Sequence, residues 1–299
     1  MATRNITKSI GGTEQFKRRS QIKAIWFRFR KNKVAMFGLI LLLAMIFLAA
    51  TADLYFNYEL DAVEHNISDR LQPPSAEHPF GTNEYGQDML ARIVYGARIS
   101  LFVGIVTISV SLIVGSIIGA SAGYYGGVVD NILMRIMDVF LAVPQTIMAI
   151  SIVAALGANL INLLIALSIA SIPKFARIVR SSVLSLKGQD FVEAAKAYGA
   201  GGRRIIAKYI LPNAIGPIIV QATLNMATTI LSIASLSFIG LGVQPPTPEW
   251  GSILAAGRSQ MLYYPYLVTI PGIAIVISVL ALNLIGDGLR DALDPRLKN

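Results

Sequence analysis

The chain alternates long apolar segments, almost free of charge, with short polar segments that carry most of its Lys, Arg, Asp and Glu. An apolar stretch of about 20 residues is long enough to cross a bilayer as a helix. The pattern predicts transmembrane helices at 34–52, 99–122, 132–156, 160–172, 214–238 and 266–285. Charged residues make up 14% of the chain, against about 25% in soluble domains. We therefore expect an all-α integral membrane protein with six transmembrane helices.

Charge predicts how these helices are oriented. The first 33 residues hold ten Lys or Arg against one acid, Glu14, and such an excess of positive charge is typical of cytoplasmic segments. The segment that follows the first helix is mainly acidic and is expected outside. The expected organisation is a cytoplasmic basic tail (1–33), a first transmembrane helix (34–52), an extracytoplasmic loop (53–94), a five-helix core (95–290) and a cytoplasmic tail (291–299).

The basic tail also predicts a contact. Its Lys and Arg residues, with Trp26 and Phe27, are typical of an amphipathic helix that rests on anionic lipid. A DNA-binding arm is the less favoured alternative, because the chain that follows is so apolar. The tail is too polar and too long for a cleavable signal peptide, so the first helix is expected to be retained.

Glycine and proline mark packing and breaks in the core. A repeat of glycine at every fourth residue predicts a stripe for close helix packing, formed by Gly115, Gly119 and Gly123. Pro144 is expected to kink the third span, and Pro173 to end the fourth. Arg135 and Asp138, one turn apart, are expected to pair. The segment 243–262 is predicted to be an outer loop rich in proline.

A polar, basic segment at 189–212 interrupts the apolar pattern. It predicts two short amphipathic helices joined by a glycine turn. Asp190 is expected to cap the first helix, with Glu193 reaching back to it, and Gly199 to supply the left-handed stop together with two later glycines. One apolar face is predicted from Phe191, Ala194, Ala195 and Tyr198, and that of the second helix from Ile205, Ile206, Tyr209 and Ile210. Pro212 is expected to interrupt the chain before the next span.

This segment resembles the EAA loop of bacterial ABC importer permeases, on the residues Glu193, Ala194, Ala195, Gly199, Ile210, Leu211 and Pro212. Three further segments resemble the oligopeptide/dipeptide family of these permeases: 78–101, 237–254 and 286–299. Asn83 and Gln87 depart from that family's usual Asp and Arg. The resemblance covers nearly the whole chain and is weakest over residues 1–75.

The resemblance implies a type I ABC importer permease fold, with a cytoplasmic helix-turn-helix at 189–212 that docks on an ATP-binding subunit. Asp190 belongs to that surface with the EAA residues. The implied role is the second of two permease subunits in the bacterial inner membrane, with both termini cytoplasmic. The implied partners are a homologous permease, two ATP-binding subunits that hold ATP and Mg, and an extracytoplasmic solute-binding protein. A helix lying on membrane lipid is the alternative for 189–212.

The sequence offers little for chemistry in the chain itself. It lacks a G-x-x-x-x-G-K-[ST] motif for ATP, and cysteine is absent. We expect no catalytic set, cofactor, metal site or nucleic-acid partner, and His78 is expected to be a solvated loop residue. The centres of the predicted spans hold no ionisable residue, which disfavours an ion-coupled carrier.

Several alternatives stay open at this point. The solute is a peptide by resemblance, but nickel, glutathione and sugar oligomers are carried by the same importer class. An ion-coupled carrier and a membrane-anchored scaffold are the other classes. Gln221 and Asn225 share one face of the fifth span, where they either line the pathway or form a buried hydrogen bond between helices.

Overall fold

A computed structural model describes residues 21–293, which form helices and loops and no β-strand. Five helices are long and apolar enough to cross a membrane, and a bent pair makes a sixth span, so the all-α fold with six spans is confirmed. The main helices are α1 (Gln21–Lys31), α2 (Lys33–Ala50), α3 (Met89–Tyr125), α4 (Gly127–Ala142), α5 (Gln145–Leu156), α6 (Leu160–Leu186), α7 (Asp190–Ala197), α8 (Gly202–Ile205), α9 (Leu211–Phe238), α10 (Trp250–Gly257) and α11 (Tyr266–Leu293). Most of tails 1–33 and 291–299 lies outside the described residues.

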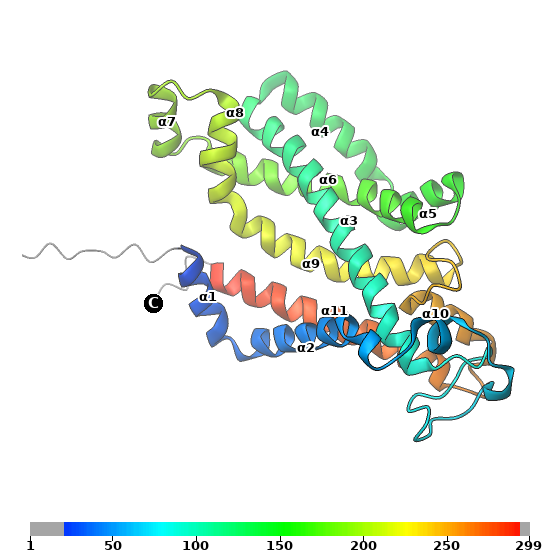
Figure 1. Ribbon diagram of the computed structural model, residues 1–299. Helices are drawn as coiled ribbons and strands as arrows, with labels where there is room; N and C mark the ends of the chain where they lie inside the picture. The colour runs from blue at the N-terminus through cyan, green and yellow to red at the C-terminus, as the bar shows by residue number, and fades with distance from the viewer. Residues whose placement is uncertain (1–20, 294–299) are drawn as a thin grey trace, which may run out of the picture.

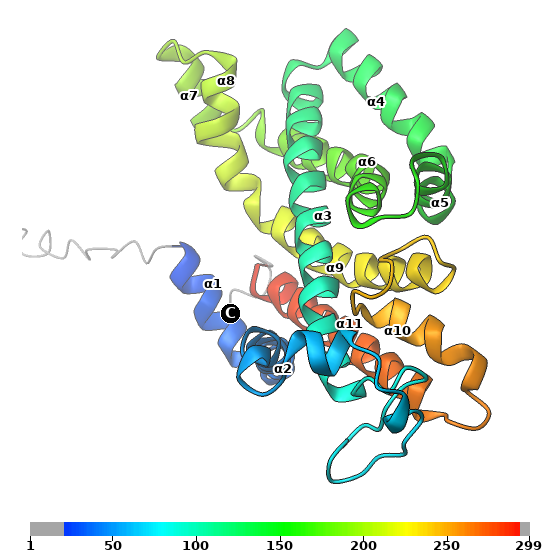
Figure 2. The same cartoon turned by 45° about the vertical axis from the view of Figure 1, so that its right-hand side comes forward.

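The bundle has two distinct ends. Figures 1 and 2 both place α1, α7 and α8 at one end, and α10 with the segment before α3 at the other. The spans α3 and α9 cross one another in the middle, and α2 and α11 run side by side. The helix α1, which belongs to the predicted basic tail, therefore lies at the same end of the bundle as the 189–212 segment.

The predicted glycine stripe forms the closest helix contact, between α3 and α6. A Cβ at Gly115 would lie 2.6 Å from the Phe175 Cβ, and one at Gly123 would lie 3.0 Å from the Arg180 carbonyl. At Gly119 a Cβ would collide with the carbonyl of Ala176. Small residues let two membrane helices approach until their backbones touch, so the packing prediction is confirmed.

The third span is broken at Pro144, as predicted. The helices α4 and α5 meet at an angle of 86°, and Figure 2 shows α4 standing away from the bundle. Asp138 does not pair with Arg135 as predicted. It accepts instead from Arg177 of α6 at 2.8 Å. Tertiary packing brings α6 alongside α4, and an arginine on a facing helix competes successfully with one on the same helix.

Pro173, which was predicted to end the fourth span, does not end it. It lies inside α6, which continues to Leu186. Membrane helices tolerate proline because neighbouring groups satisfy the freed backbone, and here the glycine contacts with α3 support both sides of it. Lys174, which was predicted to follow the fourth span, consequently lies near the middle of the longer helix α6. Its Nζ donates to the Gln145 side chain at 2.6 Å.

The end of the bundle that holds α10 is folded rather than loose. His78 is not a solvated loop residue, since its Nδ1 lies 2.8 Å from the Asp88 carboxylate and its side chain is 18% exposed. The same Asp88 caps α3 by accepting from the Ala91 N–H at 2.9 Å. Within the predicted outer loop 243–262, α10 forms a helix with Trp250 and Ile253 buried.

Hydrogen bonds to Asp53 also hold on α3 the start of the outer segment, the residues 53–88 that were predicted to lie outside. Arg98 donates to the Asp53 carboxylate at 2.8 Å, and the Tyr95 hydroxyl donates to it at 2.9 Å. The hydrogen bond from Arg98, and then that from Tyr95, lowers the pKa of Asp53 below its ordinary value. The carboxylate is thus held in its charged form.

Candidate functional site

The 189–212 segment forms a helix, a glycine turn and a second helix, as its pattern predicted. Asp190 is the first residue of α7 rather than its cap; Gln189 takes the cap position and no side chain bonds to the free N–H groups. The predicted capping box is therefore wrong. Both Asp190 and Glu193 lie in the first turn of α7, where negative charge is favourable beside the helix dipole.

Gly199 stops α7 in the way the sequence predicted. Its φ of +76° lies in the left-handed region, which other residues adopt only at a cost. Its N–H donates to the Lys196 carbonyl at 2.9 Å, and the Ala200 N–H donates to the Ala195 carbonyl at 3.0 Å. These two bonds form the Schellman motif. Gly201 has a φ of −67° and opens α8, so the later glycines do not share the left-handed stop.

The inner side of this segment is anchored in the bundle. Val192 and Ala195 of α7 are buried together with Ile205 and Ile210. They pack in one cluster with residues of three spans, namely Ala120, Val179, Val183, Ala214 and Ile218. The predicted apolar face of the second helix is confirmed by this burial. Val192 was not among the residues predicted for the face of α7.

The outer side of α7 exposes the rest of the predicted apolar face. Tyr198 is 93% exposed and Phe191 is 37% exposed, and Ala194 is exposed between them. Of the four predicted residues, only Ala195 is buried. The error has a physical reason: helical spacing marks a shared face, but it does not say whether the rest of the chain covers that face. A small, partly apolar surface is thus presented at the end of the bundle (Figure 1).

The second helix of the segment runs directly into the fifth span. Residues Gly202–Phe238 form one helical span of 37 residues, about 55 Å long at 1.5 Å per residue. Pro212 does not interrupt it. Because proline has no N–H, the helix widens before it: the Leu211 N–H donates to the Ile206 carbonyl, five residues back. The α7–α8 unit is therefore joined rigidly to a helix that crosses the whole bundle.

The proposed pathway residues lie on α9 but differ in burial. Gln221 is half-buried, whereas Asn225 is 7% exposed and its Nδ2 has no hydrogen-bond partner within the described part of the chain. Three hydroxyl residues continue their stripe at spacings of three and four: Thr228, Ser232 and Ser235. The hydroxyls donate to α9 carbonyls at 2.8–3.0 Å. This spacing is visible in the sequence and would have identified the three hydroxyl residues as part of the stripe.

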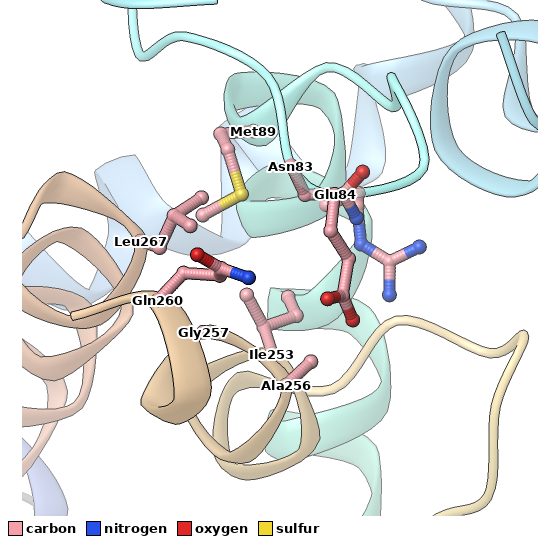
Figure 3. Close-up of a pocket in the computed structure, with 9 residues that line it drawn as sticks. Asn83, Glu84, Met89, Ile253, Ala256, Gly257, Gln260 and Leu267 are labelled. Carbon is pink, nitrogen blue, oxygen red and sulfur yellow. The ribbon is translucent and has the colours of Figure 1, made fainter. Parts of the chain in front are cut away.

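A small pocket, drawn in Figure 3, lies beside α10, at the end of the bundle opposite α7. Its lining comes from the segment before α3, the start of α3, α10, the short 3-10 helix Arg258–Gln260 and the start of α11. It comprises Asn83, Glu84, Met89, Arg92, Ile253, Ala256, Gly257, Gln260 and Leu267. The cavity volume is about 10 Å³, enough for about one water molecule. A transported solute does not fit there. Across residues 21–293, no group of three or more metal-ligating side chains gathers.

The two residues that depart from the family pattern lie beside this pocket and bond to one another. The Asn83 amide donates to the Gln87 side chain at 2.7 Å. Arg92 donates to the same Gln87 oxygen and to the Ala62 carbonyl, both at 2.6 Å. The pair is thus part of the buried network that holds the outer segment on α3.

Comparison with known proteins gives two family matches. Residues 115–299 match the family described as "binding-protein-dependent transport system inner membrane component". Residues 20–74 match the "N-terminal TM domain of oligopeptide transport permease C". The first match alone covers more than half of the chain, and together the two leave residues 1–19 and 75–114 unmatched.

Relatives of similar length agree. A dipeptide transport system permease protein of Alkalihalophilus pseudofirmus is 50% identical over 90% of this chain and 88% of its own. A di/tripeptide permease of Pseudomonas aeruginosa is 44% identical over 94% of each chain, and a glutathione permease of Escherichia coli is 43% identical over 91% and 90%.

A solved structure of the MetNI methionine ABC transporter, described as inward facing, matches with a TM-score of 0.55 at 21% identity. The match covers 69% of this chain and 98% of that one, and it supports the fold. With six spans and these relatives, the chain belongs to the inner-membrane permeases of binding-protein-dependent transport systems.

Proposed function

We propose that this chain is one of two permease subunits of an ATP-driven importer of short peptides, and that α7 and α8 dock on a partner ATPase. The observation that carries the docking proposal is the combination of an exposed α7 surface, a buried base and a continuous helix through α9. Because the buried side of α7 packs on α3, α6 and α9, a partner that moves α7 also acts on these three spans. ATP is bound and hydrolysed by the partner subunits.

The proposed cycle requires no chemistry in this chain. ATP draws the two ATPases together, and the two docking segments move with them. The spans then expose the pathway outward, and hydrolysis resets them. A ligand shifts a conformational equilibrium only by its differential affinity for the two states. Here the ATPase has different affinities for the two conformations because the exposed residues Ala194 and Tyr198 lie in a different position in each.

The peptide substrate is supported by the relatives at 44–50% identity, whose names specify dipeptides and tripeptides. The permease of E. coli at 43% identity is named for glutathione, itself a tripeptide, so glutathione is the second candidate. The stripe of Gln221, Thr228, Ser232 and Ser235 carries no charge, which suits peptide groups better than a metal ion such as nickel. We propose that this stripe lines the pathway.

The proposed orientation follows from charge and from the two ends of the bundle. The N-terminal basic segment, the C-terminus and α7 lie on the cytoplasmic side, and the segments 53–88 and 239–265 lie outside. The solute-binding protein then meets the end that holds α10, and the homologous permease completes the pathway within the membrane.

The test is copurification and transport with substitutions on the α7 surface. The chain is expressed with its neighbouring transport subunits, and Ala194→Arg is compared with Ala76→Arg, the same change at an exposed alanine of the outer segment. We expect Ala194→Arg to lose most of the bound ATPase and of dipeptide uptake, because a charge at a close contact is left unpaired. Ala76→Arg is expected to retain both. Equal behaviour of the two variants would overturn the docking proposal.

A further inference from the structure

The first helix, α1, lies across the end of α2 instead of continuing its axis (Figure 1). Asn32 marks the corner: its side-chain oxygen accepts from the Val34 and Ala35 N–H groups, both at 3.1 Å, and so caps α2. Since α2 spans the membrane, a helix set crosswise at its end runs along the membrane surface. The sequence predicted an amphipathic helix that rests on anionic lipid, and the crosswise direction of α1 in the structure agrees with that prediction.

Contacts with α11 fix α1 in this position. Phe29 is 3% exposed and lies against Gly288, where a Cβ would come within 3.2 Å of its ring. Arg28 donates to the Ala292 carbonyl at 3.3 Å. The Asn32 amide donates to the Asp291 carboxylate, also at 3.3 Å. The inner side of α1 is therefore fully engaged with the bundle.

The outer side of α1 combines aromatic and basic residues. Trp26 is 51% exposed and Phe27 is 54% exposed. Lys31 places its Nζ 4.6 Å from the centre of the Phe27 ring, and Arg30 is exposed beside them. Aromatic rings with basic groups at their edge are the composition of helices that lie at the boundary between lipid headgroups and acyl chains.

The charge of this face is not neutralised by the protein. The sequence has no Asp or Glu between residues 15 and 52. Among the described residues, neither Arg30 nor Lys31 forms a salt bridge. The helices that pack on α1 are α2 and α11. Of these, α2 has no acidic residue, and the exposed carboxylates of α11, Asp287 and Asp291, lie on the opposite side of α1. The exposed carboxylates Asp190 and Glu193 at this end belong to α7. The uncompensated face is thus complementary to a negatively charged surface.

We infer that the outer side of α1 binds anionic phospholipid of the adjoining leaflet. Trp26 and Phe27 enter the acyl boundary, and Arg30 and Lys31, with Lys33 at the start of α2, meet the headgroup phosphates. Each basic residue near an anionic surface adds to such attraction, which falls off within a Debye length. This binding does not depend on docking of an ATPase at α7, and the two proposals can fail separately.

The two tryptophans of the chain make the inference directly measurable. Trp250 is 1% exposed, so the Trp26→Phe variant reports the Trp250 fluorescence alone, and its subtraction gives Trp26. The full chain is placed in vesicles of phosphatidylcholine that contain the same mole fraction of either brominated phosphatidylglycerol or brominated phosphatidylcholine. Bromine quenches only a ring that reaches the acyl chains beside it.

We expect brominated phosphatidylglycerol to quench Trp26 at least about twofold more than brominated phosphatidylcholine, because it is enriched around α1. The double variant Arg30→Gln/Lys31→Gln is expected to reduce this ratio to about one. The matched control, Arg203→Gln/Arg204→Gln, removes the same charge from exposed positions of α8 at the same end and is expected to keep the ratio.

Three outcomes would overturn the inference. Absence of quenching by both lipids would place the α1 face in water or against a protein partner. Equal quenching by both would mean apolar insertion without recognition of the headgroup. A ratio that the α8 variant lowers as much as the α1 variant would show a general effect of net charge. An unchanged Trp250 signal confirms in each case that the variant has folded.

Discussion

Replacement of Gly199 by leucine tests the coupling segment at the residue where its geometry depends on one backbone conformation. The φ of +76° costs a non-glycine residue about 1–2 kcal/mol. No atom lies within 4 Å of a Cβ built there, so a side chain meets no steric obstacle. The whole effect therefore comes from the backbone.

A cost of this size changes the population of the correctly turned segment by a factor of about 5–30. The two hydrogen bonds of the Schellman motif stop α7, and without them the exposed face of α7 points elsewhere. We expect Gly199→Leu to reduce ATPase retention and peptide-stimulated ATP hydrolysis several-fold in the reconstituted complex. Membrane insertion is expected to survive, because the residue lies outside the spans.

Two matched variants make the reasoning specific. Gly199→Asn places a residue that tolerates the left-handed conformation, and it is expected to restore most of the activity. Gly188→Leu adds the same bulk at a glycine without positive φ and with open space around it, and it is expected to be nearly neutral. The reasoning is refuted if leucine and asparagine at 199 behave alike, or if leucine at 188 is as harmful.

The remaining predictions concern packing, orientation, energy source and pH. Gly119→Ala is expected to destabilise the chain by about 1–3 kcal/mol, because its Cβ collides with a carbonyl of α6; Gly104→Ala, whose nearest neighbour would lie at 3.5 Å, should leave the thermal midpoint nearly unchanged. A cysteine at Tyr85 should react with an impermeant reagent only from outside and one at Tyr198 only from inside, and the reverse pattern would contradict the orientation. The isolated chain should hydrolyse no ATP above a mock preparation, since it lacks a P-loop. The lowered pKa of Asp53 means that its hydrogen bonds stabilise the fold fully above its ordinary value of 3.8 and lose this contribution as the pH falls through the lower folded value; the difference in thermal stability from Asp53→Asn should therefore shrink at acid pH, and a constant difference would argue against it.

The sequence by itself determined the spans and the glycine contacts, because both depend on local features. A long apolar run is removed from water irrespective of which elements surround it. Glycine at every fourth position likewise gives a helix a flat side irrespective of which helix packs there. The left-handed turn at Gly199 is equally local, since only glycine adopts it without cost. The EAA residues, which do not include Asp190, also identified the family by resemblance. The comparisons then showed that family.

Tertiary structure decided which faces are covered and where helices end. Pro173 and Pro212 look like helix ends in the sequence, but supporting contacts and a widened turn let both helices continue. Asp138 had a partner one turn away and took one from α6, because a facing helix offers a better placed arginine. The direction of α1 and the exposure of Tyr198 likewise depend on what packs beside them, and no spacing along the chain records the presence or absence of a neighbour.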